Sequence, residues 1–257
     1  MRSHGFGVDI VSWKGFDFQT VSKYNPQSDV VFFRTGSPKA AEIALHFEKA
    51  GFAVLNDHRY IRLSGQKFIA NEYARMNGIP VPELNTVLGK DEVDMLVMYL
   101  REYGSLVAKP IYSRDMGRSV FRVATESDAS SVHGIPGSKF LLQSEVKFEK
   151  LIRTVVTTDG MMAGATIYDT KHDGWKARVC QNPNAVKYSE VPAELVTLAE
   201  KTLRVFGGCV AYIDYFETTN GFVLSEINHS CGLTDQERIT KYPIAERIAS
   251  CLINSCI

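Results

Sequence analysis

The sequence lacks a charge excess, a long apolar run and a cysteine motif. Lysine plus arginine and aspartate plus glutamate each number 29, which leaves a formal net charge of zero. Without a basic field the chain has no general attraction for phosphate backbones or anionic lipid, so we expect neither nucleic acid nor a membrane as a partner. The five cysteines contain no Cys-x-x-Cys spacing, which argues against a zinc finger and favours reduced, mostly buried thiols.

The hydrophobic segments are short. The longest, Met95–Leu100, is far below the roughly 20 residues that cross a bilayer. The first residues show no basic start followed by an apolar stretch, so we expect no signal peptide and a cytoplasmic location. The chain has 257 residues, 45% hydrophobic and 23% charged, which is typical of a folded protein with room for two or three lobes.

The first part of the chain shows a strand, a helix and a second strand. Asp29–Arg34 is apolar and β-prone, Ser37 followed by Pro38 predicts a helix start, and Gly51 predicts its end before strand Phe52–Leu55. This order predicts a small α/β lobe, which we place at residues 1–62.

The rest of the chain predicts an α+β body in two parts. We place a small subdomain at residues 63–142 and a larger one at 143–257. The prolines in Ile79–Pro82 predict an extended connection. Periodicity predicts helices over 66–77, 91–103, 192–206 and 244–253, and strands over 106–109, 120–124, 140–142, 152–157, 161–167, 209–216 and 222–228.

Asp214, Glu226 and Asn228 form the strongest candidate cluster. Glu226 and Asn228 lie two residues apart on a predicted strand, so they point to the same face. Two carboxylates and an amide oxygen are hard ligands that suit magnesium. Taken alone, the same spacing also fits two exposed carboxylates and a polar turn.

A hairpin has to bring Asp214 beside that pair. A three-residue loop, Thr219–Gly221, pairs Thr218 with Phe222 and places Asp214 opposite Glu226. A two-residue Asn-Gly turn would instead place Asp214 opposite an apolar neighbour of Glu226. We therefore predict the three-residue loop.

Other residues suit a nucleotide. Lys109 ends a predicted strand and precedes the polar loop Ser113–Gly117, whose amides could close over phosphate oxygens. Lys67 lies in the first turn of its helix, where an anion is favoured. Gln143 could reach an adenine edge and Glu145 a ribose. Taken singly, each of these residues could also be an ordinary solvent-exposed side chain without a ligand.

Taken in order, these motifs resemble the ATP-grasp superfamily, most closely its RimK-like carboxylate-amine ligases. The resemblance covers roughly residues 30 to 255. The matching positions are Asn56, Lys67, Ile79–Pro82, Val107–Pro110 with Gly117 and Val120, Gln143, Ile152-Arg153, Asp214, Glu226, Asn228 and Ser230–Gly232.

The resemblance implies an ATP-grasp fold, with a small N-terminal α/β lobe and two α+β subdomains that clasp a nucleotide. It implies that ATP phosphorylates a carboxylate and that an amine attacks the acyl phosphate, giving an amide, ADP and phosphate. The implied cofactors are ATP and magnesium, with manganese as a substitute. The implied partners are a small-molecule or peptide carboxylate, an amine and a second copy of the chain.

The resemblance also implies roles for individual residues. Asp214, Glu226 and Asn228 would hold magnesium. Arg153 and Arg178 would hold the substrate carboxylate or the oxyanion. Independently of the resemblance, Arg34 is a candidate substrate contact, because open α/β sheets bind ligands at the carboxyl ends of their strands. The residues implied to contact ATP are Lys67, Lys109, Ser113, Gly117, Gln143 and Glu145.

The departures from the family pattern lie on the acceptor side. Leu151 stands where aspartate is usual, Cys231 where proline is usual, and Lys176–Arg178 replaces an Arg-x-Asn motif. These changes favour an unusual substrate. Two alternatives stay open: an ATP-grasp kinase that phosphorylates a hydroxyl, and a nucleotide-binding scaffold without turnover.

Overall fold

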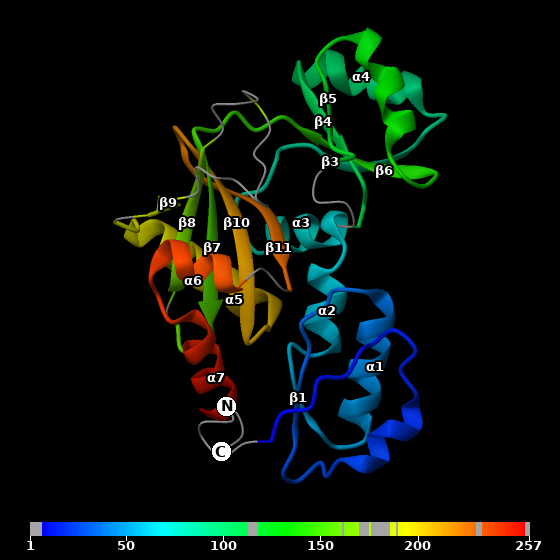
Figure 1. Cartoon of the computed structure of the whole chain (residues 1–257). Helices are drawn as coiled ribbons and strands as arrows, with labels where there is room; N and C mark the ends of the chain where they lie inside the picture. Colours follow the sequence, from blue (N-terminus) through cyan, green and yellow to red (C-terminus); the bar gives the residue numbers. More distant parts are fainter. Residues whose placement is uncertain are drawn as a thin grey trace.

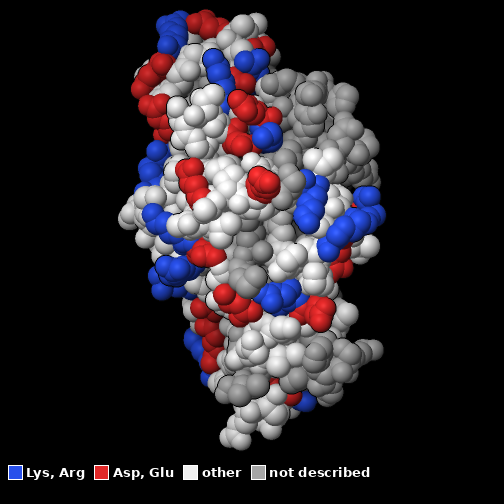
Figure 2. Space-filling model, turned by 90° about the vertical axis from the view of Figure 1, so that its left-hand side faces the viewer, with Lys and Arg blue, Asp and Glu red and all other residues white. Residues whose placement is uncertain are grey.

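The structure is a computed structural model that describes residues 7–112, 118–160, 162–169, 175, 186–188, 190–229 and 233–254. It contains three sheets (Figure 1): two strands in the order β1-β2, four in the order β3-β6-β4-β5 and five in the order β11-β10-β7-β8-β9. Basic and acidic side chains are interspersed over the face drawn in Figure 2, in keeping with the zero net charge.

The N-terminal lobe confirms the predicted β-helix-β order. Strands β1 (Val30–Phe32) and β2 (Ala53–Leu55) pair in parallel, and α1 (Pro38–Lys49) connects them. The Ser37 side chain caps α1 as predicted, because it accepts a hydrogen bond from the Ala40 amide. A short 3-10 helix, η2 (Phe18–Lys23), lies before β1, and a second helix, α2 (His58–Ser64), follows β2 and packs against α1.

The small sheet is antiparallel and lies apart from the other two, at the upper right of Figure 1. Apolar side chains, including Leu88, Leu96 and Leu106, form a hydrophobic core against this sheet. Its elements are β3 (Asn85–Gly89), α4 (Val93–Tyr103), β4 (Leu106–Lys109), β5 (Phe121–Val123), the 3-10 helix η3 (Glu126–Gly134) and β6 (Lys139–Ser144).

The large sheet carries helices on both faces. Helix α5 covers one face, where the Tyr215 hydroxyl donates to Thr202 Oγ1 at 2.8 Å. Helices α6 and α7 cover the other, where Thr166 Oγ1 donates to Gln236 Oε1 at 2.5 Å. The elements are β7 (Lys150–Thr157), β8 (Met162–Asp169), β9 (Val186–Lys187), α5 (Ala193–Phe206), β10 (Val210–Thr218), β11 (Gly221–Asn228), α6 (Leu233–Thr240) and α7 (Ile244–Asn254).

Helix α3 (Lys67–Met76) connects the N-terminal lobe to the small sheet and packs against β11. The segment Ile79–Pro82 follows it and is not helical, as the prolines predict, and the carbonyl of Pro80 accepts a hydrogen bond from the Leu224 amide. In the described part of the chain, no helix has both the length and the hydrophobicity that a membrane crossing requires.

The β10-β11 hairpin has the predicted pairing of Asp214 with Glu226, but its turn differs from the predicted one. Asp214 does lie opposite Glu226, but Thr218 pairs with Gly221, so the turn has two residues and the predicted three-residue loop is wrong. A β-bulge at Ser225 adds the missing residue and restores the register. Without that bulge, Asp214 would lie opposite Ser225.

Asn56 fastens the N-terminal lobe to the large sheet. Its side chain is buried, and its Oδ1 accepts hydrogen bonds from the amides of Cys209 at 2.9 Å and Val210 at 3.2 Å. Its Nδ2 donates to the Val210 carbonyl at 3.0 Å. The backbone of Asn56 is left-handed, with φ of 56°, a conformation that asparagine tolerates better than most residues. One side chain therefore fixes the end of β2 to the start of β10.

Candidate active site

Three charged residues form a row across the large sheet. Arg153 on β7 pairs with Asp214 on β10, which pairs with Glu226 on β11. Directly opposite residues of neighbouring strands share a face, so the three side chains project together. Asn228 lies on the same face, two residues after Glu226. Strand register thus brings the three predicted metal ligands together, and it adds Arg153.

Asp214 is the centre of this row. Arg153 Nε and Nη2 donate to its two carboxylate oxygens, each at 2.6 Å, and Asn228 Nδ2 donates to Oδ2 at 3.3 Å. Burial raises the pKa of the Asp214 carboxyl, Arg153 opposes that rise, and Glu226 adds to it. A carboxylate has about four lone pairs, so these three bonds leave one lone pair, on Oδ1, for a further ligand.

Two lysines complete the cluster. Lys67 Nζ lies 3.1 Å from Glu226 Oε1. Lys109 is half-buried at the end of β4, and desolvation together with the charge of Lys67 lowers its pKa to about 8, while Glu226 opposes the shift. The Lys67 amide donates to the Ile111 carbonyl at 3.2 Å, which holds the start of α3 against the segment after β4. Lys67, Lys109 and Glu226 therefore lie in one neighbourhood.

The cluster fits a magnesium ion bound to nucleotide phosphates. Asp214, Glu226 and Asn228 offer hard oxygen donors on one face, the donor type that magnesium prefers. The described residues contain no group of three or more His, Cys, Asp and Glu that could hold a metal, so a site here would consist of two carboxylates and an amide oxygen. Lys67 and Lys109 would meet phosphate oxygens.

The two residues predicted to contact adenosine are tied into the small sheet. Gln143 is buried, and its Nε2 donates to Asn85 Oδ1 at 2.8 Å. Glu145 Oε2 accepts from Arg122 Nε at 3.0 Å. Their nucleotide role stays a prediction. Ser113, Gly117, Arg178 and Cys231 lie outside the described residues, and Arg34 is exposed.

His229 lies beside this site, although the sequence pattern assigns it no definite role. It follows Asn228 directly and is buried, and its Nε2 lies 2.8 Å from Ser64 Oγ. Its ring packs against Gly36, where an added Cβ would lie 2.4 Å from two ring atoms. Burial lowers the pKa of His229 to about 4, with Glu226 opposing the shift. A neutral imidazole therefore joins the strand of the predicted metal ligands to the N-terminal lobe.

Comparisons with known proteins give a family and several similar proteins. A family model described as the RimK-like ATP-grasp domain matches residues 65–252. The tetrahydromethanopterin:alpha-L-glutamate ligase of Methanocaldococcus jannaschii is 23% identical over 210 residues, which cover 78% of this chain and 70% of that protein. A probable alpha-L-glutamate ligase of Legionella pneumophila is 25% identical over 233 residues, which cover 87% and 75%.

A solved structure shares the fold. It is the ATP-grasp ligase PsnB complexed with a phosphomimetic variant of a minimal precursor, Mg and ADP. The TM-score is 0.65 at 16% identity, and the match covers 85% of this chain and 67% of that one. At this identity the likeness establishes the arrangement of elements.

Proposed function

Because the chain belongs to the RimK-like ATP-grasp family, we propose that the row of charged residues on β7, β10 and β11 is the active site of an ATP-dependent carboxylate-amine ligase. The ATP-grasp fold and this class of reaction agree with the expectation from the motifs. A carboxylate oxygen attacks the terminal phosphate of ATP and ADP leaves. The amine then attacks the acyl carbon, loses a proton and displaces phosphate, which leaves an amide.

The observation that carries the proposal is that two basic side chains, from α3 and β4, meet the carboxylates of the large sheet. Lys67 and Lys109 lie beside Glu226, and Glu226 lies opposite Asp214. In phosphoryl transfer the protein mainly positions groups and stabilises charge. We assign the lysines to phosphate oxygens and Asp214, Glu226 and Asn228 to magnesium. When bound, magnesium would neutralise charge on the phosphates.

We assign Arg153 to the substrate side of the site. Its guanidinium is held by Asp214 with two hydrogen bonds, which fixes its orientation. The remaining N–H groups of a guanidinium can meet a carboxylate or an oxyanion. Arg178 is proposed for the same purpose on the family pattern, and Gln143 and Glu145 for adenosine.

A hydroxylamine trap tests the proposal. The protein is incubated with ATP, magnesium, pooled carboxylic acids and hydroxylamine, and both ADP and hydroxamate are measured. We expect hydroxamate from one pool and its loss in Asp214→Asn. Asp235→Asn is the matched control, because Asp235 is an exposed carboxylate on α6, and it should keep full activity.

Three results would contradict the proposed site or its reaction. ADP release with a phosphorylated product and no hydroxamate would identify a kinase. Hydroxamate formation that persists undiminished in Asp214→Asn would mean that the chemistry takes place elsewhere. Nucleotide binding without ADP release from any pool, peptides included, would favour a scaffold.

A further inference from the structure

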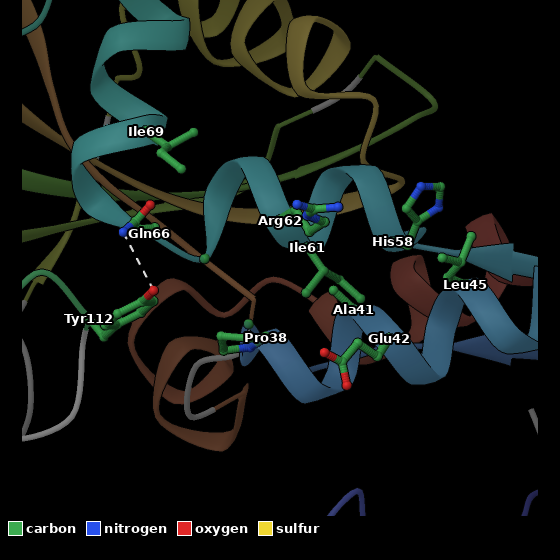
Figure 3. Close-up of a pocket in the computed structure, with 12 residues that line it drawn as sticks. Pro38, Ala41, Glu42, Leu45, His58, Ile61, Arg62, Gln66, Ile69 and Tyr112 are labelled. Carbon is green, nitrogen blue, oxygen red and sulfur yellow. Dashed lines mark hydrogen bonds between the residues drawn. The ribbon is translucent and has the colours of Figure 1, made fainter. Parts of the chain in front are cut away.

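A groove runs between α1 and α2 on the N-terminal lobe (Figure 3). Its volume is about 340 Å³, which lies within the range of small-ligand sites. Ala41 and Leu45 from α1 and Ile61 from α2 form its apolar part, and the first two of these come from successive turns of α1. The groove is therefore a trough with apolar side chains on the walls that both helices form.

The two helices place opposite charges along this trough. Glu42 lies on α1 and Arg62 on α2, and both side chains are exposed. Neither makes a hydrogen bond or an ion pair with the described residues, in contrast to His58 in the same groove, whose Nδ1 lies 2.5 Å from Glu48 Oε2. An acidic and a basic group thus remain available to a ligand on opposite walls.

One end of the groove lies at the start of α3, the helix that begins with Lys67. Gln66 and Tyr112 line that end, and Gln66 Nε2 donates to the Tyr112 hydroxyl at 3.4 Å. Gln66 immediately precedes Lys67, and the Lys67 amide bonds to Ile111, the neighbour of Tyr112. A molecule that reacts beside Lys67 can therefore extend past Gln66 into the groove.

We propose that this groove binds a peptide segment of the carboxylate substrate, upstream of its reacting carboxylate. The proposal rests on the ligase function proposed above. An apolar side chain of the peptide packs on Ile61 and Leu45, and neighbouring side chains of opposite charge meet Glu42 and Arg62. The amide of Gln66 and the hydroxyl of Tyr112 pair with peptide N–H and C=O groups. This chemistry suits a peptide better than a second nucleotide, because an exposed carboxylate on the wall would repel phosphate.

Equilibrium binding tests the groove independently of turnover. Calorimetry is run with magnesium and a non-hydrolysable ATP analogue. The probes are the peptides Glu-Leu-Lys-Ala and Lys-Leu-Glu-Ala, and their leucine-to-glycine counterparts. We expect one leucine peptide to bind about tenfold more tightly than its glycine counterpart, because the groove buries the leucine side chain. Arg62→Glu should weaken the binding of that leucine peptide by a similar factor.

Lys39→Glu is the matched control, since Lys39 is an exposed residue of α1 that does not line the groove. It makes the same charge reversal on the same lobe and should leave peptide binding unchanged. Equal binding of leucine and glycine peptides, or equal loss in Lys39→Glu and Arg62→Glu, would overturn the proposal. Absence of peptide binding would overturn it as well.

The same peptides in the hydroxylamine trap separate the two proposals. Peptide binding that depends on Arg62, without any hydroxamate, would support the groove and contradict the ligase. Hydroxamate from peptides with a KM that Arg62→Glu does not change would support the ligase and contradict the groove. A peptide KM that rises in Arg62→Glu, while the KM for ATP stays constant, would support both.

Discussion

At the scale of single residues, Asp214 depends on Arg153. The carboxylate is buried, and two of its hydrogen bonds come from one guanidinium. Arg153→Ala removes that partner and leaves a buried charge uncompensated, which typically costs about 3 kcal/mol or more of folding free energy. We expect this loss in urea unfolding at pH 7. Arg101→Ala is the control, because Arg101 and Glu126 are mostly exposed, and its effect should stay below about 1 kcal/mol.

The loss in Arg153→Ala should depend on pH. Burial and Glu226 raise the pKa of Asp214, and without Arg153 the largest opposing influence is gone. A carboxyl with a raised folded-state pKa lowers stability only where the unfolded chain is ionised, above about pH 4. The deficit against the wild type should therefore shrink as the pH falls from 7 toward 4. A deficit that is constant over that range would mean that Arg153 acts through packing alone.

Lys109 gives nucleotide binding its own pH dependence. Its pKa of about 8 means that it is mostly charged at neutral pH and mostly neutral one pH unit above that pKa. Binding a phosphate above the pKa then requires proton uptake, so affinity for a non-hydrolysable ATP analogue should fall by up to about tenfold per pH unit. Calorimetry in buffers of different ionisation enthalpy measures that uptake directly. Lys109→Arg should bind the ATP analogue without proton uptake. Proton uptake equal to that of the wild type in this variant would assign the titration to another group.

At the scale of elements, the sequence predicted those whose apolar pattern was regular. The helix predicted over 192–206 and the strand over 106–109 match α5 and β4 closely. Helix α2, strand β3 and helix α6 are not predicted, because apolar residues make up less than half of each and show no regular period. The bulge at Ser225 could not be foreseen, since its only sequence signal is a polar residue that precedes Glu226. The predicted pairing of Asp214 with Glu226 is confirmed, although the predicted three-residue turn is wrong.

Non-local pairings set the remaining limit on prediction. The motifs identified Arg153 and Asp214, but their salt bridge depends on β7 lying beside β10, which neither segment reveals by itself. The lowered pKa of Lys109 likewise depends on non-local packing, since desolvation lowers it most and Lys67, on α3, lowers it further. Gln143 looked available for adenine, yet its partner Asn85 lies on a strand that was not predicted.

The close approach of Gly36 to His229 predicts a steric coupling between the N-terminal lobe and the large sheet. An added Cβ on Gly36 would lie 2.4 Å from ring atoms of His229. Gly36→Ala should lower stability by about 1 to 3 kcal/mol, the usual effect of overpacking. His229→Ala removes the ring, so adding Gly36→Ala to it should cost much less than adding it to the wild type. Urea unfolding of the four proteins gives this coupling.

A matched glycine shows whether that effect is local. A Cβ added to Gly7 would meet no atom within 4 Å, and Gly7 has no positive φ, so Gly7→Ala should change stability by less than about 0.5 kcal/mol. Additive effects of Gly36→Ala and His229→Ala would contradict a direct contact between the two residues. Since His229 follows Asn228, relief of the clash in the double variant would also show that the N-terminal lobe and β11 are mechanically joined.

At the scale of the whole molecule, Asn56 decides whether the N-terminal lobe stays on the large sheet. Asn56→Ala removes the acceptor of two buried amides, Cys209 and Val210, and each unsatisfied group costs about 1 to 3 kcal/mol. The lobe should open before the sheets unfold, because its own sheet has only two strands. Native-state hydrogen exchange should then show faster exchange in α1 and unchanged exchange in β4 and β6. Asn220→Ala, in an exposed turn, is the control. Equally faster hydrogen exchange in all three sheets of Asn56→Ala would mean that they unfold as one cooperative unit.

Selective opening would separate the α1–α2 groove from Lys67, so peptide affinity should fall more than nucleotide affinity in Asn56→Ala.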